Sequence, residues 1–532
     1  MNFAARLDRL AAERPRQRAL VRPAGRDPRD GRRLWAQLTF SQLHEMTNST
    51  ARGFASAGIG QGDRVILLVE PSFEFFSIIF ALWKLGAVPV LIDPGMGLSG
   101  FLACVRQIRP RVCIGVPRAM LLSKLKATDF ESVELRVTVG PSTWFWGGET
   151  LPLLMDPGPL QTLDVPGDAV AGVLFTSGST GPAKGVRYSH GMFEAQATRI
   201  AALYGIEAGQ VDVPCFLPFA MFSCVMGMTV VLPDMDFSKP ATARPEALAE
   251  AIIEHGAHQL VGSPAVMRRL ARWAPDKGVR FPSLERVLTF GAPIPRDLHE
   301  TFRELLAEGV DIHTPYGATE ALPVASTSTT AILAELGART ASGEGTCVGG
   351  VAPDTNVRVI RITDEPIPTW SEELVLPPGE VGEICVKGPQ VSSEYVGRPE
   401  ATSAAKIQDG EGFWHRMGDL GFVDAQGRLW FCGRKAHRVR CSDGELVFPV
   451  PLEGVFNEVD GVLRSAVVEV SGAPVLVVEG KADEGELLRV AKANPVTRRV
   501  ERVLFHPGFP VDRRHNAKIH RLQLRDWARD RT

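Results

Sequence analysis

The sequence predicts an α/β protein: a large N-terminal domain of doubly wound α/β subdomains, followed by a smaller domain. Residues 64–69 (RVILLV) and 88–92 (VPVLI) are continuous apolar runs of strand length, and a helix-like stretch over 72–86 separates them. Strands that are apolar throughout are typical of a parallel sheet covered by helices on both faces. A chain of 532 residues also exceeds what one compact core usually holds, which predicts two or more domains.

The same pattern recurs along the first two thirds of the chain. Apolar positions at helical spacing predict a helix over 41–58 that ends at Gly58. Further strands are expected at 169–175, 258–263 and 286–293, with a helix at 264–274. Alternation of apolar strands with helices supports the α/β class.

From about residue 345 the sequence changes to short strands with frequent turns, as in VRVIRI, GEICVKG and LWFCG. This pattern predicts a small β-rich subdomain at the end of the large domain. Charged residues follow a strand and a glycine at Arg434–Lys435, which predicts a domain boundary there. We therefore expect an N-terminal domain over 1–434 and a small α+β domain over 435–532.

Composition argues against several classes of protein. The formal net charge is −2, so no basic field is present to attract nucleic acid or an anionic membrane. The charged, amphipathic start and the lack of an apolar run of membrane-spanning length predict a cytoplasmic protein without signal peptide or transmembrane segment. The stretch Arg22–Arg33 is interrupted by Gly, Pro and Asp and is expected to be a solvated surface loop. The eight cysteines form no CxxC pair and are expected to be buried thiols.

A loop rich in glycine and hydroxyl residues gives the strongest functional signal. In VLFTSGSTGPAKGV (173–186) an apolar strand ends at Phe175, and Lys184 follows the loop closely. Glycines let backbone N–H groups turn toward an oxyanion, hydroxyls add donors, and a lysine adds positive charge. The pattern therefore predicts a phosphate site. Because no GxxxxGK[ST] occurs, this loop is not that of the P-loop NTPases.

The segment TSGSTGPAKGV resembles the signature loop of the adenylate-forming superfamily, which includes acyl-CoA synthetases, peptide-synthetase adenylation domains and luciferase. The resemblance continues in order along nearly the whole chain. It implies an ATP-dependent, AMP-forming ligase in which this loop holds the β- and γ-phosphates, Lys184 assists catalysis and Thr180 lies at the Mg²⁺. The implied nucleotide-binding residues of the loop are Thr176, Ser177, Gly178, Ser179, Thr180 and Gly181.

A second segment, FGAPI, is similar to the family segment that lies against adenine. The resemblance implies contacts through Gly291, Ala292 and Pro293. Gly-Ala-Pro is also an ordinary turn, so this motif is weak when taken alone.

The segment TPYGATE is a stronger match to the family. The resemblance implies that Tyr316 stacks on adenine beside Gly317, that Thr319 contacts the α-phosphate region and that Glu320 ligates Mg²⁺. These roles suit the metal, because Mg²⁺ usually binds one or two carboxylates together with phosphate oxygens.

Motifs near the end of the chain complete the resemblance. WHRMGDLG supplies Asp419, which is implied to accept hydrogen bonds from both ribose hydroxyls, and Arg434 is implied to reach the ribose or a phosphate. Lys435 resembles the hinge about which the mobile small domain turns. In PVDRRHNAKIHR, Lys518 resembles the lysine that enters the site and stabilises charge at the α-phosphorus.

The chain departs from the acyl-CoA synthetases where those enzymes bind their thiol. Met221 stands in LPFAMFSCVMG where a histidine is expected, Ala436 and Cys441–Asp443 are atypical of CoA ligation, and no carrier domain is expected. Together with PFAMF, YGATEALPVAST, GRKAHRV and GFPVDRRHNAKIHR, these departures resemble the olefin β-lactone synthetases of bacterial long-chain hydrocarbon biosynthesis.

That resemblance implies adenylation of a long-chain 2-alkyl-3-hydroxy fatty acid, after which the substrate's own 3-hydroxyl displaces AMP and closes a β-lactone. ATP and Mg²⁺ are the implied cofactors, and assembly with neighbouring enzymes of the olefin pathway is a further expectation. The apolar stretch 215–232 is expected to line the alkyl pocket, with Phe219, Met221 and Phe222 as candidates. A buried core segment is the alternative interpretation of these three residues.

Two other functions stay open at this point. A fatty-acyl-CoA or fatty-acyl-AMP ligase with an unusual thiol site would share the nucleotide motifs, and CoA dependence of product formation would separate it from a lactone synthetase. A nucleotide-binding regulator descended from an inactive ligase is disfavoured, because Lys184, Glu320, Asp419, Arg434 and Lys518 are all intact.

Overall fold

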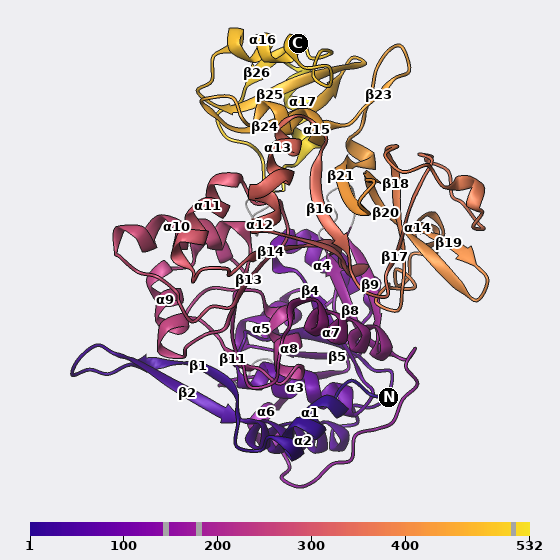
Figure 1. Ribbon diagram of the computed structural model, residues 1–532. Helices are drawn as coiled ribbons and strands as arrows, with labels where there is room; N and C mark the ends of the chain where they lie inside the picture. The colour runs from indigo at the N-terminus through magenta and orange to yellow at the C-terminus, as the bar shows by residue number, and fades with distance from the viewer. Residues whose placement is uncertain (142–147, 177–182, 512–517) are drawn as a thin grey trace.

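The computed structural model describes residues 1–141, 148–176, 183–511 and 518–532, and its main body is built on two sheets (Figure 1). Among these residues, the first sheet has the strand order β7-β6-β5-β3-β4-β8-β9. All neighbours in it are parallel except β8 and β9, which confirms the predicted parallel α/β core. The strand bounds are β3 (Arg64–Leu68), β4 (Val88–Ile92), β5 (Val112–Gly115), β6 (Leu135–Thr138), β7 (Glu149–Thr150), β8 (Val170–Thr176) and β9 (Lys184–Ser189).

The helices against this sheet follow from apolar patterning and capping. Helix α3 (Phe73–Lys84) begins where the Ser72 hydroxyl caps its first turn, and it is buried from residue 75 to its end. Helix α2 (Phe40–Ser56) begins with a capping box between Thr39 and Gln42. Both helices match the predicted ranges to within two residues. The other helices here are α1 (Ala5–Glu13), η1 (Pro94–Met96), α4 (Gly97–Ile108), α5 (Pro117–Leu125), α6 (Leu151–Leu154) and α7 (His190–Tyr204).

The second sheet follows the path β17-β18-β20-β21-β16-β15-β14-β13-β12-β10-β11-β1-β2 in the described chain, with β19 on β20. Its neighbours from β1 through β11, β10, β12 and β13 to β14 are parallel, and the remaining pairs are antiparallel. The strand bounds are β1 (Arg18–Arg26), β2 (Arg33–Thr39), β10 (Val211–Pro214), β11 (Thr229–Val231), β12 (Gln259–Gly262), β13 (Arg286–Thr289), β14 (Ile312–Ala318), β15 (Ala321–Ser328), β16 (Thr346–Val351), β17 (Asn356–Ile360), β18 (Gly382–Lys387), β19 (Lys406–Asp409), β20 (Gly412–Val423) and β21 (Arg428–Arg434).

Helices on this half include the predicted one at 264–274, which the structure places over Pro264–Asp276 as α10. The short strands expected after residue 345 are present, and they extend the core sheet through the antiparallel pair of β15 and β16. The remaining helices are α8 (Leu217–Val225), η2 (Pro240–Thr242), α9 (Pro245–Glu254), α11 (Arg296–Leu305), α12 (Thr329–Ala331), η3 (Ile332–Leu336), α13 (Gly337–Ala341), η4 (Glu372–Leu374) and α14 (Pro399–Ala405).

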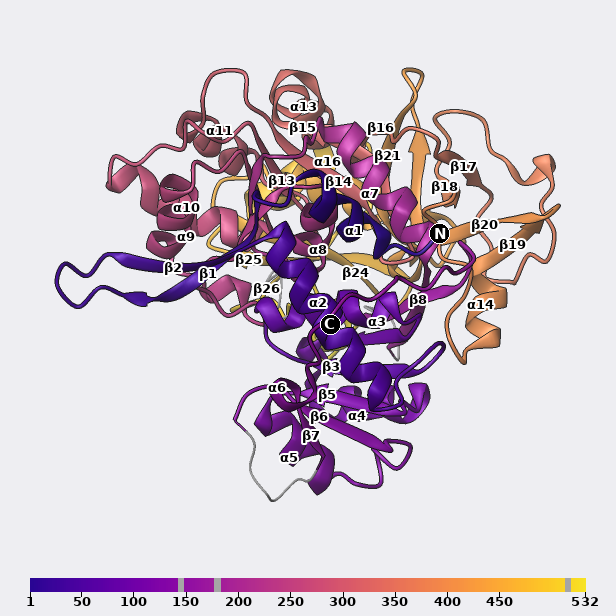
Figure 2. The same ribbon diagram turned by 90° about the horizontal axis from the view of Figure 1, so that it is seen from below.

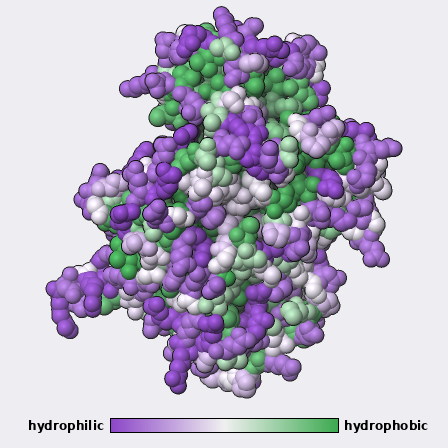
Figure 3. All heavy atoms as spheres, in the orientation of Figure 1, coloured by the Kyte–Doolittle hydropathy of each residue, from purple (hydrophilic) through white to green (hydrophobic). Residues whose placement is uncertain are grey.

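The Arg-rich stretch near the N-terminus is only half loop: residues 22–26 and 33 lie in strands, and the expected surface loop is confined to the turn at residues 27–32. β1 and β2 form an antiparallel hairpin, and β1 adds to the edge strand β11 in parallel. Ion pairs secure the arginines at its ends, with Arg26 2.9 Å from Glu250 and Arg33 2.9 Å from Asp234. The hairpin projects from the body, and its tip is hydrophilic (Figures 1 and 3).

The C-terminal segment (residues 435–532) forms a separate layer at the top of Figure 1. Its described strands pair only with one another, in the orders β22-β23 and β24-β25-β26. Helix α15 contacts α13, β21 and β16 of the main body. The bounds are η5 (Lys435–His437), β22 (Val439–Arg440), β23 (Leu446–Val447), α15 (Pro449–Phe456), β24 (Val462–Val470), β25 (Ala473–Gly480), α16 (Glu484–Ala493), β26 (Val503–Phe505) and α17 (Arg521–Arg529). The domain boundary at 434/435 stays a prediction.

In the view from below, the β1–β2 hairpin extends to the left, and strands β3 and β5–β7 of the first sheet lie in the lower part of the picture (Figure 2). No helix in the described part of the chain is long and apolar enough to cross a bilayer. The eight cysteines are free and buried, as predicted.

Candidate active site

Strand register brings together the predicted residues of the nucleotide site. Asp419 of β20 lies directly opposite Arg434 of β21 in an antiparallel pair. Thr319 and Glu320 form the tight turn between β14 and β15, whose ends pair at Ala318 and Ala321. Tyr316 of β14 bonds Asp419, and Glu320 is close enough to act on the pKa of Asp419, so the two hairpins meet at one site although they are far apart in the sequence.

Asp419 is the centre of this group. Tyr316 Oη donates a hydrogen bond of 2.7 Å to Asp419 Oδ2, and Arg434 Nη1 lies 3.0 Å from Oδ1. Burial raises the pKa of Asp419, and Arg434 and Tyr316 oppose that rise. The Arg434 contact does not have hydrogen-bond geometry, so the buried Oδ1 has no hydrogen-bond partner among the residues that the structure describes. A buried acceptor without a donor is costly, and a ligand hydroxyl would satisfy it.

Tyr316 and Arg434 both hold their protons at neutral pH. Burial raises the pKa of Tyr316 well above its ordinary value, and Asp419 raises it further. The Asp419 charge raises the pKa of Arg434 against the effect of burial. Phe431, which the sequence analysis did not single out, packs against Tyr316 with ring centroids 6.3 Å apart. Stacking of Tyr316 on adenine stays a prediction.

Two tyrosines that the sequence analysis missed hold the turn that carries Glu320. Tyr395 Oη donates to Glu320 Oε1 at 2.7 Å, and Tyr188 Oη donates to the Thr319 carbonyl at 2.6 Å. Lys184 Nζ lies 4.7 Å from the centroid of the Tyr395 ring, within the range of a cation–π contact. The chain has only four tyrosines, and three of them, Tyr188, Tyr316 and Tyr395, converge here. That rarity is the one signal in the sequence that could have drawn attention to them.

A pair of basic side chains, the buried His415 and the half-buried Lys406, lies behind this turn. Lys406 and His415 oppose each other on β19 and β20, and Lys406 Nζ lies 3.0 Å from His415 Nδ1. Lys406 also donates to the carbonyl of Ser392, whose N–H donates to the Glu320 carbonyl at 2.8 Å. Burial lowers the pKa of Lys406 to about 7, with Glu320 opposing the shift. The sequence analysis missed this pair, although recognising a hairpin at Asp409–Gly412 would have placed the two residues opposite each other.

Lys518, in the C-terminal segment, lies near enough to this site for its charge to act on Asp419. Its positive charge acts on Asp419 and lowers the pKa of that carboxyl. An isolated β-bridge between Val511 and Ile519 anchors the residue after Lys518. Lys518 is therefore near the group formed by β14, β20 and β21, and its catalytic role stays a prediction.

The structure describes little or nothing of the predicted residues in the phosphate loop. Ser177, Gly178, Ser179, Thr180 and Gly181 lie outside the described residues. For Thr176, the backbone is at the end of β8, opposite Lys184 in the β8–β9 pair. Their roles in phosphate and Mg²⁺ binding stay predictions.

The predicted adenine segment forms the turn after β13. Gly291 has φ +97°, a left-handed conformation that glycine adopts without the steric cost of a side chain. Gly291 and Pro293 are exposed and Ala292 is half-buried, so the turn is accessible to a ligand. Gly317 lies under the Ala321 carbonyl, where an added Cβ would approach to 2.5 Å.

The predicted alkyl-pocket residues lie on α8. Phe219, Met221 and Phe222 are buried, and the Phe219 ring is 5.3 Å from that of Phe290. Phe290 directly precedes Gly291, so the aromatic group adjoins the adenine segment. The three side chains belong to the main hydrophobic core, and their contact with substrate stays a prediction.

The candidate hinge, Lys435, is held by the main body. Its Nζ donates to Glu383 Oε2 and to the Thr363 carbonyl, both at 3.0 Å. Glu383 is 1% exposed and also pairs with Arg416 at 2.6 Å. The side chain of Lys435 is therefore fixed at the point where β21 ends, and its role as a hinge stays a prediction.

The carboxylate oxygens at this site fit a nucleotide and its metal. Asp419 Oδ1 is an unsatisfied acceptor suited to a ribose hydroxyl. Glu320 uses Oε1 for Tyr395, and Oε2 makes no hydrogen bond with the described residues. One available carboxylate oxygen suits Mg²⁺, because this ion takes most of its ligands from water and phosphate.

Comparison with known proteins agrees with this arrangement. Residues 7–396 match the family model of the AMP-binding enzymes. The chain is 45% identical to an olefin beta-lactone synthetase of Stenotrophomonas maltophilia (strain K279a), with 99% of this chain and 98% of that protein aligned. It is 43% identical to an olefin beta-lactone synthetase of Xanthomonas campestris pv. campestris, with 99% of this chain and 97% of that protein aligned.

The fold is also that of a solved enzyme, O-succinylbenzoate coenzyme A synthetase from Bacillus subtilis in complex with ATP and magnesium ion. The TM-score is 0.74 at 22% identity, with 98% of this chain and 99% of that chain aligned. Together, the family match over most of the chain and the two full-length relatives show that this chain belongs to the AMP-binding, adenylate-forming enzyme family.

Proposed function

We propose that this enzyme adenylates a long-chain 2-alkyl-3-hydroxy fatty acid and then closes the acyl adenylate to a β-lactone, releasing AMP and pyrophosphate. The convergence of Lys518, Asp419 and Glu320 on one site supports the adenylation step. The names of the two full-length relatives support the lactone step. Met221, buried on α8 where a thiol-tunnel histidine is expected, agrees with an enzyme that needs no external thiol.

In the binding step, each half of ATP has its own set of residues. Asp419 accepts hydrogen bonds from the ribose hydroxyls through its unsatisfied Oδ1, and Arg434 supports the same carboxylate. The turn at Gly291 lies against adenine, and the loop before Lys184 holds the phosphates. Mg²⁺ bound by Glu320 and phosphate oxygens would neutralise the charge of the pyrophosphate leaving group.

In the adenylation step, a carboxylate oxygen of the fatty acid bonds to the α-phosphorus and the bond to the β-phosphate oxygen breaks. The products are acyl-AMP and pyrophosphate. Lys518 stabilises the negative charge on the α-phosphate oxygens and the incoming carboxylate. A cation held in place where water is partly excluded is effective in this role, because it need not reorganise during the reaction. Tyr395 and Tyr188 hold Glu320 and Thr319 in place while this charge moves.

In the lactone step, the 3-hydroxyl oxygen bonds to the acyl carbon and the bond from that carbon to AMP breaks. AMP leaves with the bonding electron pair, and the hydroxyl proton passes to water. Attack within one bound molecule can have an effective molarity of about 10⁵–10⁸ M. This advantage, with a good leaving group, offsets the strain of a four-membered ring.

A reaction without CoA tests the proposal. The enzyme, ATP, Mg²⁺ and a 3-hydroxy fatty acid should give AMP, pyrophosphate and a neutral product lighter than the acid by one water, identified by mass spectrometry and NMR. The matched acid without the hydroxyl should give roughly one pyrophosphate per active site, because its acyl-AMP has no internal nucleophile within about 3–3.5 Å of the acyl carbon. Rapid turnover of the deoxy acid with CoA to a thioester would replace this proposal with an acyl-CoA ligase.

A further inference from the structure

A short helical run between β15 and β16 supports the C-terminal segment. It comprises α12, the π-helical turn η3 and α13, and we call residues 329–343 the docking run. Figure 1 shows α13 beside α15, where the main body meets the C-terminal segment, and the two helices are in contact.

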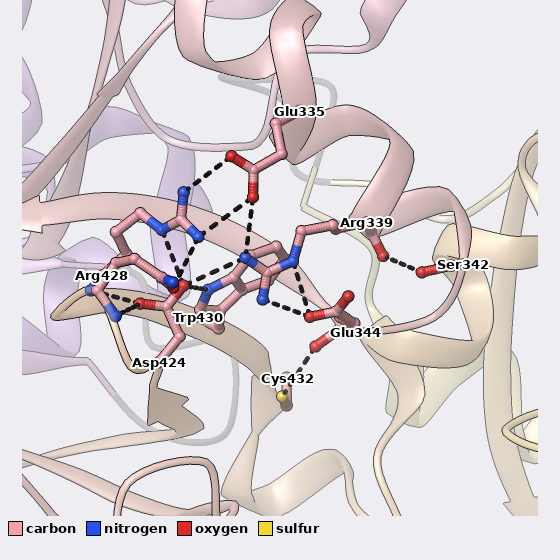
Figure 4. Close-up of polar contacts among 9 residues, drawn as sticks. Glu335, Arg339, Ser342, Glu344, Asp424, Arg428, Trp430 and Cys432 are labelled. Carbon is pink, nitrogen blue, oxygen red and sulfur yellow. Dashed lines mark hydrogen bonds and ion pairs between the residues drawn. The ribbon is translucent and has the colours of Figure 1, made fainter.

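Arg339 fixes the docking run to the sheet below it (Figure 4). Its guanidinium donates to Glu344 Oε2 at 2.5 and 2.9 Å, and lies 4.4 Å above the Trp430 ring. It also donates to Asp424 Oδ2 at 3.3 Å, the oxygen that accepts from Trp430 Nε1 at 2.9 Å. Glu335 also accepts from Arg339, at 3.3 Å. One arginine, three carboxylates and a buried ring thus hold one helical turn in place.

Glycine at one position lets the C-terminal segment approach this run closely. A Cβ at Gly454, within α15, would lie 2.4 Å from the Thr340 carbonyl oxygen. Beside it, Asn494 Nδ2 donates to the Ser342 carbonyl at 3.2 Å. An alanine at Gly454 would therefore push α15 away from α13, although alanine is the better helix former.

The residue next to this contact is tied to the segment that carries Lys518. Glu453 accepts hydrogen bonds from Arg521 at 2.5 and 2.7 Å in a bidentate pair. Glu453 Oε1 also accepts from the backbone N–H of Val467 at 2.8 Å, which fixes it on β24. Arg521 is three residues after Lys518, so the Glu453–Arg521 pair links the position of α15 to the position of Lys518.

We propose that Arg339 and Gly454 are positioning residues for Lys518, acting across the two parts of the chain. Arg339 holds the docking run, Gly454 admits α15 to it, and the Glu453–Arg521 pair transmits that position to Lys518. This proposal rests on the role of Lys518 in adenylation given above.

The first test is Gly454→Ala, with Gly485→Ala as the matched control. Gly485 is another helical glycine of the C-terminal segment, and within 4 Å its added Cβ would meet only the Asp483 carboxylate that caps α16, at 3.1 Å, which requires a shift of a few tenths of an ångström and no movement of backbone. A displacement near 1 Å can cost about 10²-fold in rate. Gly454→Ala should lower kcat for pyrophosphate release by about 10²-fold while leaving the KM for ATP and the thermal unfolding temperature unchanged, and Gly485→Ala should behave as wild type. A wild-type rate for Gly454→Ala would overturn the proposal.

A second measurement reports docking itself. Asn494 bonds the Ser342 carbonyl, so cysteines introduced by Ser342→Cys and Asn494→Cys should be joined rapidly by a short bifunctional thiol reagent. The eight natural cysteines are buried and should not compete for the reagent. Adding Gly454→Ala or Arg339→Met should slow this crosslinking, and adding Lys518→Ala should not. Unchanged crosslinking with Gly454→Ala would overturn the docking proposal. Pyrophosphate release that persists in Lys518→Ala would instead remove the assigned role of Lys518, so the two failures are distinguishable.

Discussion

The two halves of the candidate active site are assembled in different ways. The first half lies in the second sheet, where Asp419 and Arg434 face each other through strand register and Tyr316 reaches the same carboxylate from β14. The second half is Lys518, whose charge acts on Asp419 and which belongs to the C-terminal segment that contacts the main body through α15. The first half is therefore built with the sheet, whereas the second depends on how two parts of the chain meet. This difference predicts that nucleotide binding and phosphoryl chemistry can be impaired separately.

The largest expected effect is a loss of reaction rate when Lys518, the second half of the site, is changed. Lys518→Ala should lower the rate of pyrophosphate release by about 10²–10³-fold, because one preorganised donor contributes roughly 2.7–4 kcal/mol to a charged transition state. ATP affinity, measured by calorimetry, should stay near the wild-type value, since Asp419 and Glu320 remain. A large loss of ATP affinity in this variant would contradict the division between the halves.

A smaller effect, on the KM for ATP, is expected when Asp419 in the first half of the site is changed. Asp419→Asn keeps the shape of the side chain but loses the charge, and hydrogen bonds to charged groups are worth about 1.5–3 kcal/mol. The KM for ATP should rise about 10-fold or more, with a smaller change in kcat. Tyr316→Phe removes only one donor to the same carboxylate and should raise KM less.

The outcome that would break the comparison is a reversed pattern, in which Asp419→Asn lowers kcat and leaves the KM for ATP unchanged. The pH dependence sharpens the same test. Burial raises the pKa of Asp419, so ATP affinity should be lost on acidification at a higher pH than for an ordinary aspartate.

The smallest effect concerns the half-buried base behind Glu320. Lys406 has a pKa of about 7 in the folded protein and an ordinary value of 10.5, so between these values the unfolded chain binds a proton that the folded chain does not. The free energy of unfolding therefore rises with pH in this window. Lys406→Met should flatten that slope by up to about 1.4 kcal/mol per pH unit, measured by urea unfolding from pH 7 to 10.5.

Lys124 is exposed on α5, so Lys124→Met is the matched control and should leave the slope unchanged. An identical slope in Lys406→Met and the wild-type protein would show that Lys406 carries its charge in the folded state throughout this range.

Local sequence patterns identified one group of features correctly. Apolar runs gave β3, β4 and α3 within a residue or two, because backbone geometry and side-chain periodicity are properties of neighbouring residues. Short motifs likewise pointed to Tyr316, Asp419 and Lys518, which the structure brings to one site. A phosphate loop or a tight turn needs particular residues at fixed spacing, so its chemistry is written in a few consecutive positions.

The features that the sequence did not give are contacts between distant segments. Tyr188 meets Thr319 across 131 residues, and Tyr395 meets Glu320 across 75. The Lys406–His415 pair, the Arg339 network and the approach of Gly454 to Thr340 are likewise not apparent from local spacing. By itself, the sequence determined the α/β elements and the residue types of the nucleotide site. Only the tertiary structure decided which side chains hold those residues in place, because burial and hydrogen bonding between remote segments depend on how sheets and helices pack.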